Sequence, residues 1–209
     1  MKSIVLLGTG NVATNLFHAL QGIKNFKVIQ IYNHREDSLQ NFEEIPSTTK
    51  FEEIVNADIY LIAVKDDHIA NISQGLRSKN ALVLHTSGGK SIEILDNERS
   101  GVFYPLQTFS RKRLIEFNEL PVCIEAKHEN DLEILTELAN ELKAKVYHIN
   151  SDQRKSLHVA AVFVNNFVNH LYTEAEQICL NNNVPFEILL PLIKETAHKV
   201  STLNPYDAQ

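Results

Sequence analysis

The residues Gly8-Thr9-Gly10-Asn11-Val12-Ala13 form a glycine-rich string near the start of the chain. Gly8 permits a tight turn, and Gly10 lets the backbone approach a diphosphate closely. Ala13, in place of a third glycine, still allows a helix to pack closely on a strand. The diphosphate would then lie on the free N–H groups of the following helix. The string therefore predicts a dinucleotide-binding loop, and the alternative is a glycine turn without a ligand.

Asn33-His34-Arg35 follow the second predicted strand, where an NAD site usually places an acid on the ribose hydroxyls. None of the three is a carboxylate, and the planar guanidinium of Arg35 suits a 2′-phosphate. The alternative is a solvated arginine paired with Glu36 or Asp37. We therefore expect NADP(H), with NAD(H) less favoured. The cofactor contacts predicted from the loop and from the strand end are Gly8, Thr9, Gly10, Asn11, Val12, Asn33, His34 and Arg35.

Three more polar loops follow predicted strands, at 64–68, 85–89 and 104–108. Ligands of an open α/β sheet lie beyond the carboxyl ends of its strands, so we expect His85, Ser87, Tyr104 and Gln107 near a reacting centre. His85 titrates in a range suited to acid–base catalysis, but a structural hydrogen-bonding role is an equal alternative. Ser87 could donate to a substrate oxygen or cap the next helix, and capping is favoured.

A second group of polar residues lies on a predicted helix, at Lys155, His158, Asn165, Asn166 and Asn169. Most of them fall on one stripe of an otherwise apolar helix, and polar groups in such a place need partners. The partners could be cofactor and substrate, or buried hydrogen bonds between helices. We favour a proton-donating role for His158 and weigh the two readings equally for Asn166.

Alternating strands and helices position these residues. The continuous apolar run at 4–7 is typical of a buried parallel strand, and further strands are predicted at 28–32, 59–64, 81–84, 101–104, 122–125 and 145–149. Helical spacing is found from Val12 onward and at 51–57, 69–76 and 129–142. This alternation predicts a Rossmann-type α/β domain with a mainly parallel sheet over residues 1–150.

The pattern changes after Asn150. A long helix is predicted from Asp152 to Asn182, and a second from Phe186 to Leu203 with a kink at Pro191. Residues 151–209 thus form a smaller all-α domain, close to the lower size limit for folding unaided, and we expect it to pack on a partner.

Composition excludes several classes of protein. The 209 residues carry 20 basic and 26 acidic side chains, a formal net charge of −6, which disfavours nucleic acid as a partner. No apolar run is long enough to span a membrane. The two cysteines have no metal-site spacing and no disulfide pattern, so we expect no metal and a cytoplasmic location.

Several of these strings together resemble one family. Beyond the glycine loop they are Ala63-Val64-Lys65, His85-Thr86-Ser87-Gly88, Tyr104-Pro105-Leu106-Gln107-Thr108-Phe109, and the helix from His158 to Asn166. The chain is similar over nearly its whole length to Rossmann-like proteins with a C-terminal DUF2520 domain. That group is related to pyrroline-5-carboxylate reductase and to 6-phosphogluconate dehydrogenase-like proteins.

The resemblance implies NADP(H) binding, oxidoreductase activity on an unestablished substrate, and a homodimer formed through the C-terminal helices. It assigns Gly8, Gly10, Asn11, Val12, Arg35, Val64 and Lys65 to the cofactor. It places His158, His85, Asn166, Ser87 and Gln107 around the reacting centre. Tyr104 departs from the family pattern, which often has histidine before the proline. The pattern also continues past Gln209 with a Thr-Gly-Pro segment and more helix, so either the sequence is a shortened form or part of the substrate pocket is missing.

Two functions therefore compete. The first is an NADP(H)-dependent oxidoreductase that reduces a small carbonyl or imine compound, with His158 or His85 as proton donor and Asn166 and Ser87 orienting the substrate. The second is a sensor or scaffold that holds NADP(H) without turnover, because a fold alone does not confer activity.

Overall fold

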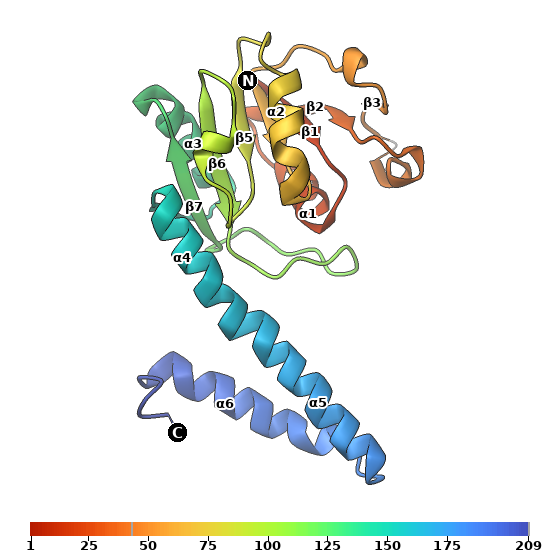
Figure 1. Ribbon diagram of the computed structural model, residues 1–209, viewed down its shortest axis with the longest axis vertical. Helices are drawn as coiled ribbons and strands as arrows, with labels where there is room; N and C mark the ends of the chain where they lie inside the picture. The colour runs from red at the N-terminus through yellow and green to blue at the C-terminus, as the bar shows by residue number, and fades with distance from the viewer. Residues whose placement is uncertain (43, 209) are drawn as a thin grey trace. The chain divides into compact units, whose positions relative to one another are not determined.

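The computed structural model describes residues 1–42 and 44–208 (Figure 1). The chain divides into two compact units, Met1–Val159 and Ala160–Gln209. The predicted boundary, between Asn150 and Asp152, stays a prediction. Within the described residues no helix is long and apolar enough to cross a membrane.

The first unit is built on one eight-stranded sheet with the order β3-β2-β1-β4-β5-β6-β7-β8. Only the β6–β7 pair is antiparallel, so the predicted α/β fold with a mainly parallel sheet is confirmed. The strands are β1 (Lys2–Leu7), β2 (Phe26–Tyr32), β3 (Ser47–Thr48), β4 (Ile59–Ile62), β5 (Leu82–His85), β6 (Ser100–Pro105), β7 (Pro121–Ala126) and β8 (Lys145–His148). Chain order runs outward in both directions from β1 and β4, and this switch point is where such sheets bind ligands.

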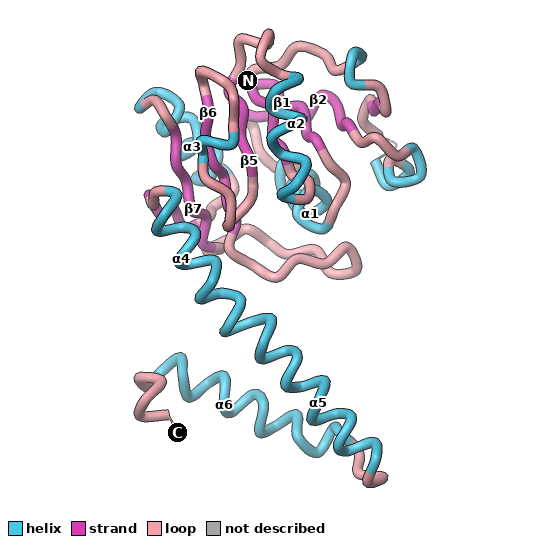
Figure 2. Tube along the Cα trace, viewed as in Figure 1, coloured by secondary structure: helices cyan, strands magenta, loops and turns pink. Residues whose placement is uncertain are grey.

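Both faces of the sheet are buried, which explains the continuous apolar strands. Ile4 and Leu6 of β1 join the core on the face covered by α1 (Asn11–Leu20) and α3 (Glu129–Glu141). Val5 and Leu7 join a second core on the opposite face, together with α2 (Ile69–Gly75). Figure 2 shows these helices around the magenta strands.

The helix predicted for 51–57 is wrong. Only a short 3-10 turn forms there, η3 (Phe51–Glu53). Side chains of two strands bind the backbone that a helix would use. The Gln30 amide donates to the Glu53 carbonyl (3.0 Å) and accepts from the Val55 N–H (2.9 Å), and the Tyr60 hydroxyl donates to the Val55 carbonyl (2.9 Å). These contacts hold the segment extended into β4.

The long helix after Asn150 is present and contains a π-helical stretch. It consists of α4 (Ser151–Ala161), the π-helical η6 (Val162–Phe167) and α5 (Val168–Asn181). A 3-10 turn, η7 (Phe186–Leu189), and α6 (Leu190–Thr202) follow. The kink expected at Pro191 is wrong, because Pro191 stands in the first turn of α6, where its missing N–H removes no helical hydrogen bond.

Candidate active site

The glycine loop lies where β1, β2 and β4 end together. Gly8 has a φ of 116°, and a Cβ there would stand 2.3 Å from the carbonyl oxygen of Ala63. Its N–H donates to the Tyr32 carbonyl at 2.8 Å. Only glycine fits this position.

Gly10 differs from Gly8 in having open space above it. A Cβ at Gly10 would meet no atom within 4 Å, and among the described residues no side chain caps the start of α1. The first N–H groups of α1 are therefore free to donate hydrogen bonds to an anion. A tight glycine followed by an open glycine at a helix start is the geometry that a dinucleotide diphosphate requires.

The predicted nucleotide-selecting residues behave differently from one another. Asn33 is buried, and its side-chain amide donates to the Thr9 hydroxyl at 2.7 Å, so it fixes the shape of the glycine loop. His34 is exposed. The Arg35 side chain is 61% exposed and donates to the Ser38 hydroxyl (3.1 Å), with the Asp37 carboxylate at 3.7 Å. An exposed ion pair of this length contributes little, so the guanidinium is free to exchange it for a phosphate.

The end of β4 contacts the same loop. Val64 is half-buried, and its Cγ1 lies 3.0 Å from where a Gly8 Cβ would be. Lys65, which follows it, is exposed. These two predicted cofactor residues therefore flank the switch point from the β4 side.

The second cluster joins the ends of β5 and β6 to α4. The Tyr104 hydroxyl lies 3.1 Å from Nδ1 of His158. A Cβ on Gly88 would stand 2.6 Å from Cζ of Tyr104 and 2.7 Å from Nδ1 of His158, so a larger residue at 88 would have to displace this pair. Burial raises the pKa of Tyr104 to about 12, hence its hydroxyl stays protonated at neutral pH. The predicted candidates Tyr104 and His158 thus lie together, half-buried.

His85 and Ser87 lie on the neighbouring turn. His85 is fully buried, and its Nδ1 accepts the Ser87 N–H at 3.1 Å. Burial, and secondly the nearby Arg154, lower the pKa of His85 to about 4, so the ring is neutral at pH 7. Ser87 Oγ accepts the N–H groups of Gly89 (3.2 Å) and Lys90 (3.1 Å) within its own turn. The expectation that Ser87 caps the next helix is wrong, because the 3-10 turn η5 (Ile92–Ile94) is capped by Ser91.

Arg154, which sequence reasoning missed, fixes α4 to the sheet. Its side chain is completely buried, pairs with Glu125 of β7 and donates to the Lys90 carbonyl at 2.6 Å. Ser151 Oγ donates to the same carboxylate at 2.8 Å. Arg154 and His158 are four residues apart and share a helix face, so this ion pair sets the position of His158. The four-residue spacing between Arg154 and His158 is the sequence signal that could have identified Arg154.

The remaining predicted residues do not join this cluster within the first unit. Gln107 is exposed, and its side-chain oxygen accepts the Thr108 N–H at 2.8 Å. Asn165, Asn166 and Asn169 belong to the second unit and are exposed. Asn165 donates to Asn166 at 3.4 Å.

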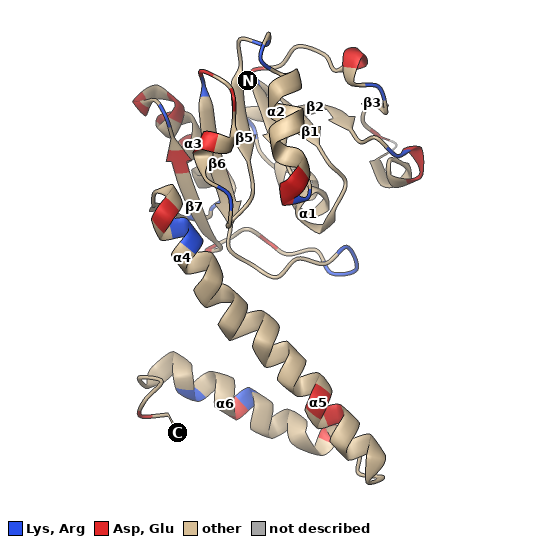
Figure 3. Ribbon diagram, in the orientation of Figure 1, with Lys and Arg blue, Asp and Glu red and all other residues tan. Residues whose placement is uncertain are grey.

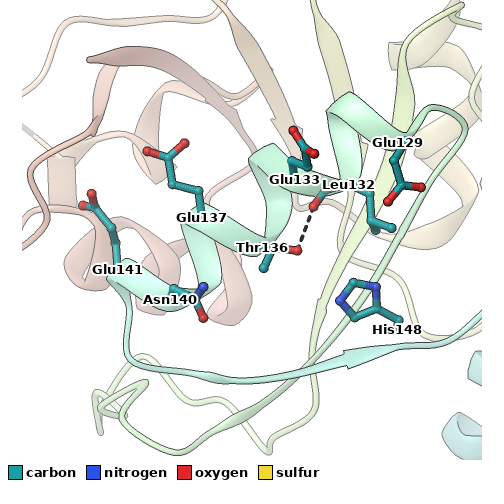
Figure 4. Close-up of a pocket in the computed structure, with 8 residues that line it drawn as sticks. All are labelled: Glu129, Leu132, Glu133, Thr136, Glu137, Asn140, Glu141 and His148. Carbon is teal, nitrogen blue, oxygen red and sulfur yellow. Dashed lines mark hydrogen bonds between the residues drawn. The ribbon is translucent and has the colours of Figure 1, made fainter.

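A cavity of about 620 Å³ lies elsewhere, over α3 and β8 (Figure 4). It is lined by Glu129, Leu132, Glu133, Thr136, Glu137, Asn140, Glu141 and His148. Glu137 accepts from Lys2 (2.9 Å) and Glu141 from the Lys24 N–H (2.8 Å), so these two carboxylates bind α3 to the rest of the unit. The negative lining would repel a dinucleotide, and no predicted site residue belongs to it.

Comparisons with known proteins agree with this arrangement. The family model "NADP oxidoreductase coenzyme F420-dependent" matches residues 3–88, and the model "Domain of unknown function (DUF2520)" matches residues 120–209. A comparison with curated proteins finds no match.

Among solved structures, a Bacteroides fragilis protein provisionally described as an NADP oxidoreductase is 41% identical, covering 100% of this chain and 83% of that one, with a TM-score of 0.91. A Thermotoga maritima protein is 22% identical (99% and 81% covered, TM-score 0.77). Plasmodium falciparum pyrroline carboxylate reductase with NADP bound is 15% identical (97% and 80% covered, TM-score 0.69). The last two show likeness of fold alone. The predicted resemblance is confirmed: the chain belongs to the family of oxidoreductases that join an NADP oxidoreductase-type Rossmann domain to a DUF2520 domain.

Proposed function

We propose that this chain is an NADP(H)-dependent oxidoreductase that reduces a small carbonyl or imine compound. The observation that carries the proposal is the Tyr104–His158 pair, with its two polar atoms 3.1 Å apart against Gly88, at the same sheet edge as the open glycine loop. One edge thus offers both a diphosphate cradle and a group able to supply a proton.

The chemistry divides between cofactor and protein. The bound reduced nicotinamide supplies a hydride to the substrate carbon. His158, in its imidazolium form, donates a proton from Nε2 to the substrate oxygen or nitrogen and becomes neutral. The Tyr104 hydroxyl fixes the ring through Nδ1, leaving Nε2 for the substrate. His85 is the weaker candidate because its pKa of about 4 leaves it without a proton to give as an imidazolium at neutral pH.

Ser87 and Asn166 orient the substrate in this proposal. Ser87 Oγ accepts two backbone N–H groups, and its own O–H is left to donate to a substrate oxygen. Asn166 carries a side-chain amide with both donor and acceptor atoms, in the second unit.

The cofactor in this proposal is NADP(H) rather than NAD(H). The exposed and loosely paired guanidinium of Arg35 supports that preference, because it lies just beyond β2, two residues after the buried Asn33. Small shifts of an exposed arginine suffice to form a bidentate contact with a phosphate.

The chain also forms a homodimer through its C-terminal helices in this proposal. The support is the set of large apolar side chains that the second unit leaves exposed: Phe163, Val164, Phe167, Leu171, Ile178, Leu180, Ile188, Leu190, Leu192 and Val200. Exposed apolar surface on this scale is typical of protein interfaces. Sedimentation without nucleotide tests the dimer, and a monomer at micromolar concentrations would contradict it.

Turnover of NADPH with a panel of keto acids, aldehydes and cyclic imines tests the function. We expect His158→Ala to lose about 10²–10⁴-fold in kcat while its affinity for NADPH is retained. The control is His170→Ala, a 67% exposed histidine on α5. Tight NADPH binding without turnover of any compound would instead favour the sensor or scaffold.

A further inference from the structure

The loop that joins β6 to β7, residues 106–120, returns to the start of α1 (the long green loop in Figure 1). The side-chain amide of Asn11 donates to the Phe109 carbonyl at 3.1 Å. The buried Asn15 donates to the Ser110 carbonyl at 3.1 Å and accepts the Ile115 N–H at 2.9 Å. The first two turns of α1 therefore hold this loop in place.

Apolar side chains anchor the same loop. Phe117 is buried in the core beneath α1, with Phe109 and Ile115 packed against that core. The rings of Phe109 and Phe117 stack with centroids 6.0 Å apart. Polar and apolar anchors on both sides of residues 111–113 give these three residues a defined position.

The anchored part of the loop places Arg111 on the glycine loop itself. The Arg111 guanidinium donates through Nη2 to the Thr9 carbonyl at 2.5 Å. Thr9 stands between the tight Gly8 and the open Gly10. A guanidinium has five N–H donors, so the other N–H groups of Arg111 remain available to a second acceptor at this position.

The loop tip is strongly positive. Arg111, Lys112 and Arg113 are consecutive and exposed, and Figure 3 shows the tip in blue. Within residues 1–42 and 44–208, no carboxylate forms a salt bridge with any of the three. The first turn of α1 has no acidic residue either. Three uncompensated cations repel one another in a chain of net charge −6, which favours an anionic ligand between them and α1.

We propose that Arg111, assisted by Lys112 and Arg113, is a ligand of the dinucleotide diphosphate, which it holds from the side opposite the N-terminus of α1. The inference rests on the proposed function. In this proposal Arg111 binds the diphosphate, which NADH and NADPH share. Arg35 binds the 2′-phosphate, which only NADPH carries. Arg111 then bridges the glycine loop carbonyl and the phosphate oxygens.

Calorimetric titration with NADPH and with NADH separates the two arginines. We expect Arg111→Ala to weaken both dinucleotides by about tenfold and by the same factor, as loss of one charge-assisted hydrogen-bonding group does. Arg35→Ala should weaken NADPH much more than NADH. Added salt should weaken binding by the wild-type protein more than by Arg111→Ala, because the lost contact is ionic.

The control for lost charge is Arg77→Ala, an exposed arginine paired with Asp96. It should bind both dinucleotides as the wild-type protein does. Circular dichroism checks that each variant is folded. If Arg111→Ala does not fold, the double variant Lys112→Ala/Arg113→Ala, which changes only exposed side chains, should weaken both dinucleotides several-fold.

Unchanged affinity of the folded variants, or a loss confined to NADPH, would overturn the inference and leave the proposed function standing. A wild-type protein that binds neither dinucleotide would overturn both. An equal loss for NADH and NADPH supports the assignment of Arg111 to the diphosphate.

Discussion

His85 should make the stability of the first unit depend on pH. Its pKa is lowered from 6.5 to about 4 in the folded protein, first by burial and then by Arg154. Between pH 6.5 and about 4, His85 is therefore protonated in the unfolded chain but stays neutral in the folded chain. The stabilisation is fully present above pH 6.5 and is lost as the pH falls toward 4.

The magnitude follows from the two pKa values. The interval from 6.5 to about 4, at about 1.4 kcal/mol for each pH unit, corresponds to about 3 kcal/mol of unfolding free energy. A domain of this size is usually stable by only about 5–15 kcal/mol, so the loss is large enough to measure. It adds to whatever the other titrating groups contribute.

Urea titrations monitored by circular dichroism, repeated from neutral pH down to pH 4, measure the effect. The comparison is with His85→Asn, whose side-chain oxygen can still accept the Ser87 N–H but cannot be protonated. The wild-type protein should lose about 3 kcal/mol more than the variant over this range. Parallel losses in the two proteins, or an NMR titration that places the pKa of His85 near 6.5, would refute the reasoning.

Two further predictions concern buried groups of the first unit. Arg154→Met should destabilise the protein by about 3–5 kcal/mol, because it leaves the Glu125 carboxylate without its buried partner. Thermal or urea unfolding measures this loss. A loss under about 1 kcal/mol would contradict a structural ion pair there. Cys123 is buried and its pKa is raised to about 11, chiefly by burial, whereas Cys179 is partly exposed. A thiol reagent at mildly alkaline pH should therefore modify Cys179 well before Cys123 in the native protein, and equal rates in the wild-type protein and in Cys179→Ser would rule this out.

The sequence predicted the elements that local pattern controls. Apolar runs such as Ile4–Leu7 indicated strands buried on both faces, and the two core clusters of β1 confirm that reading. The glycine loop was identified because backbone conformation at Gly8 depends on the residue itself. The helix predicted at 51–57 is wrong because Gln30 and Tyr60, from other strands, bind the backbone there. The kink predicted at Pro191 is wrong because Pro191 stands in the first turn of a helix.

The candidate site was predicted only as residue types. Tyr104 and His158 were both candidates, but their pairing depends on the absent Cβ of Gly88 and on Arg154, contacts between segments far apart in the chain. The low pKa of His85 likewise comes from burial by the whole fold. Sequence by itself determined the strands and the glycine loop, because these rest on short-range backbone preferences and apolar spacing. It also indicated the family, because several of its strings resemble that family. Only the tertiary structure decided which histidine meets a partner and which cations reach α1, because those depend on long-range packing.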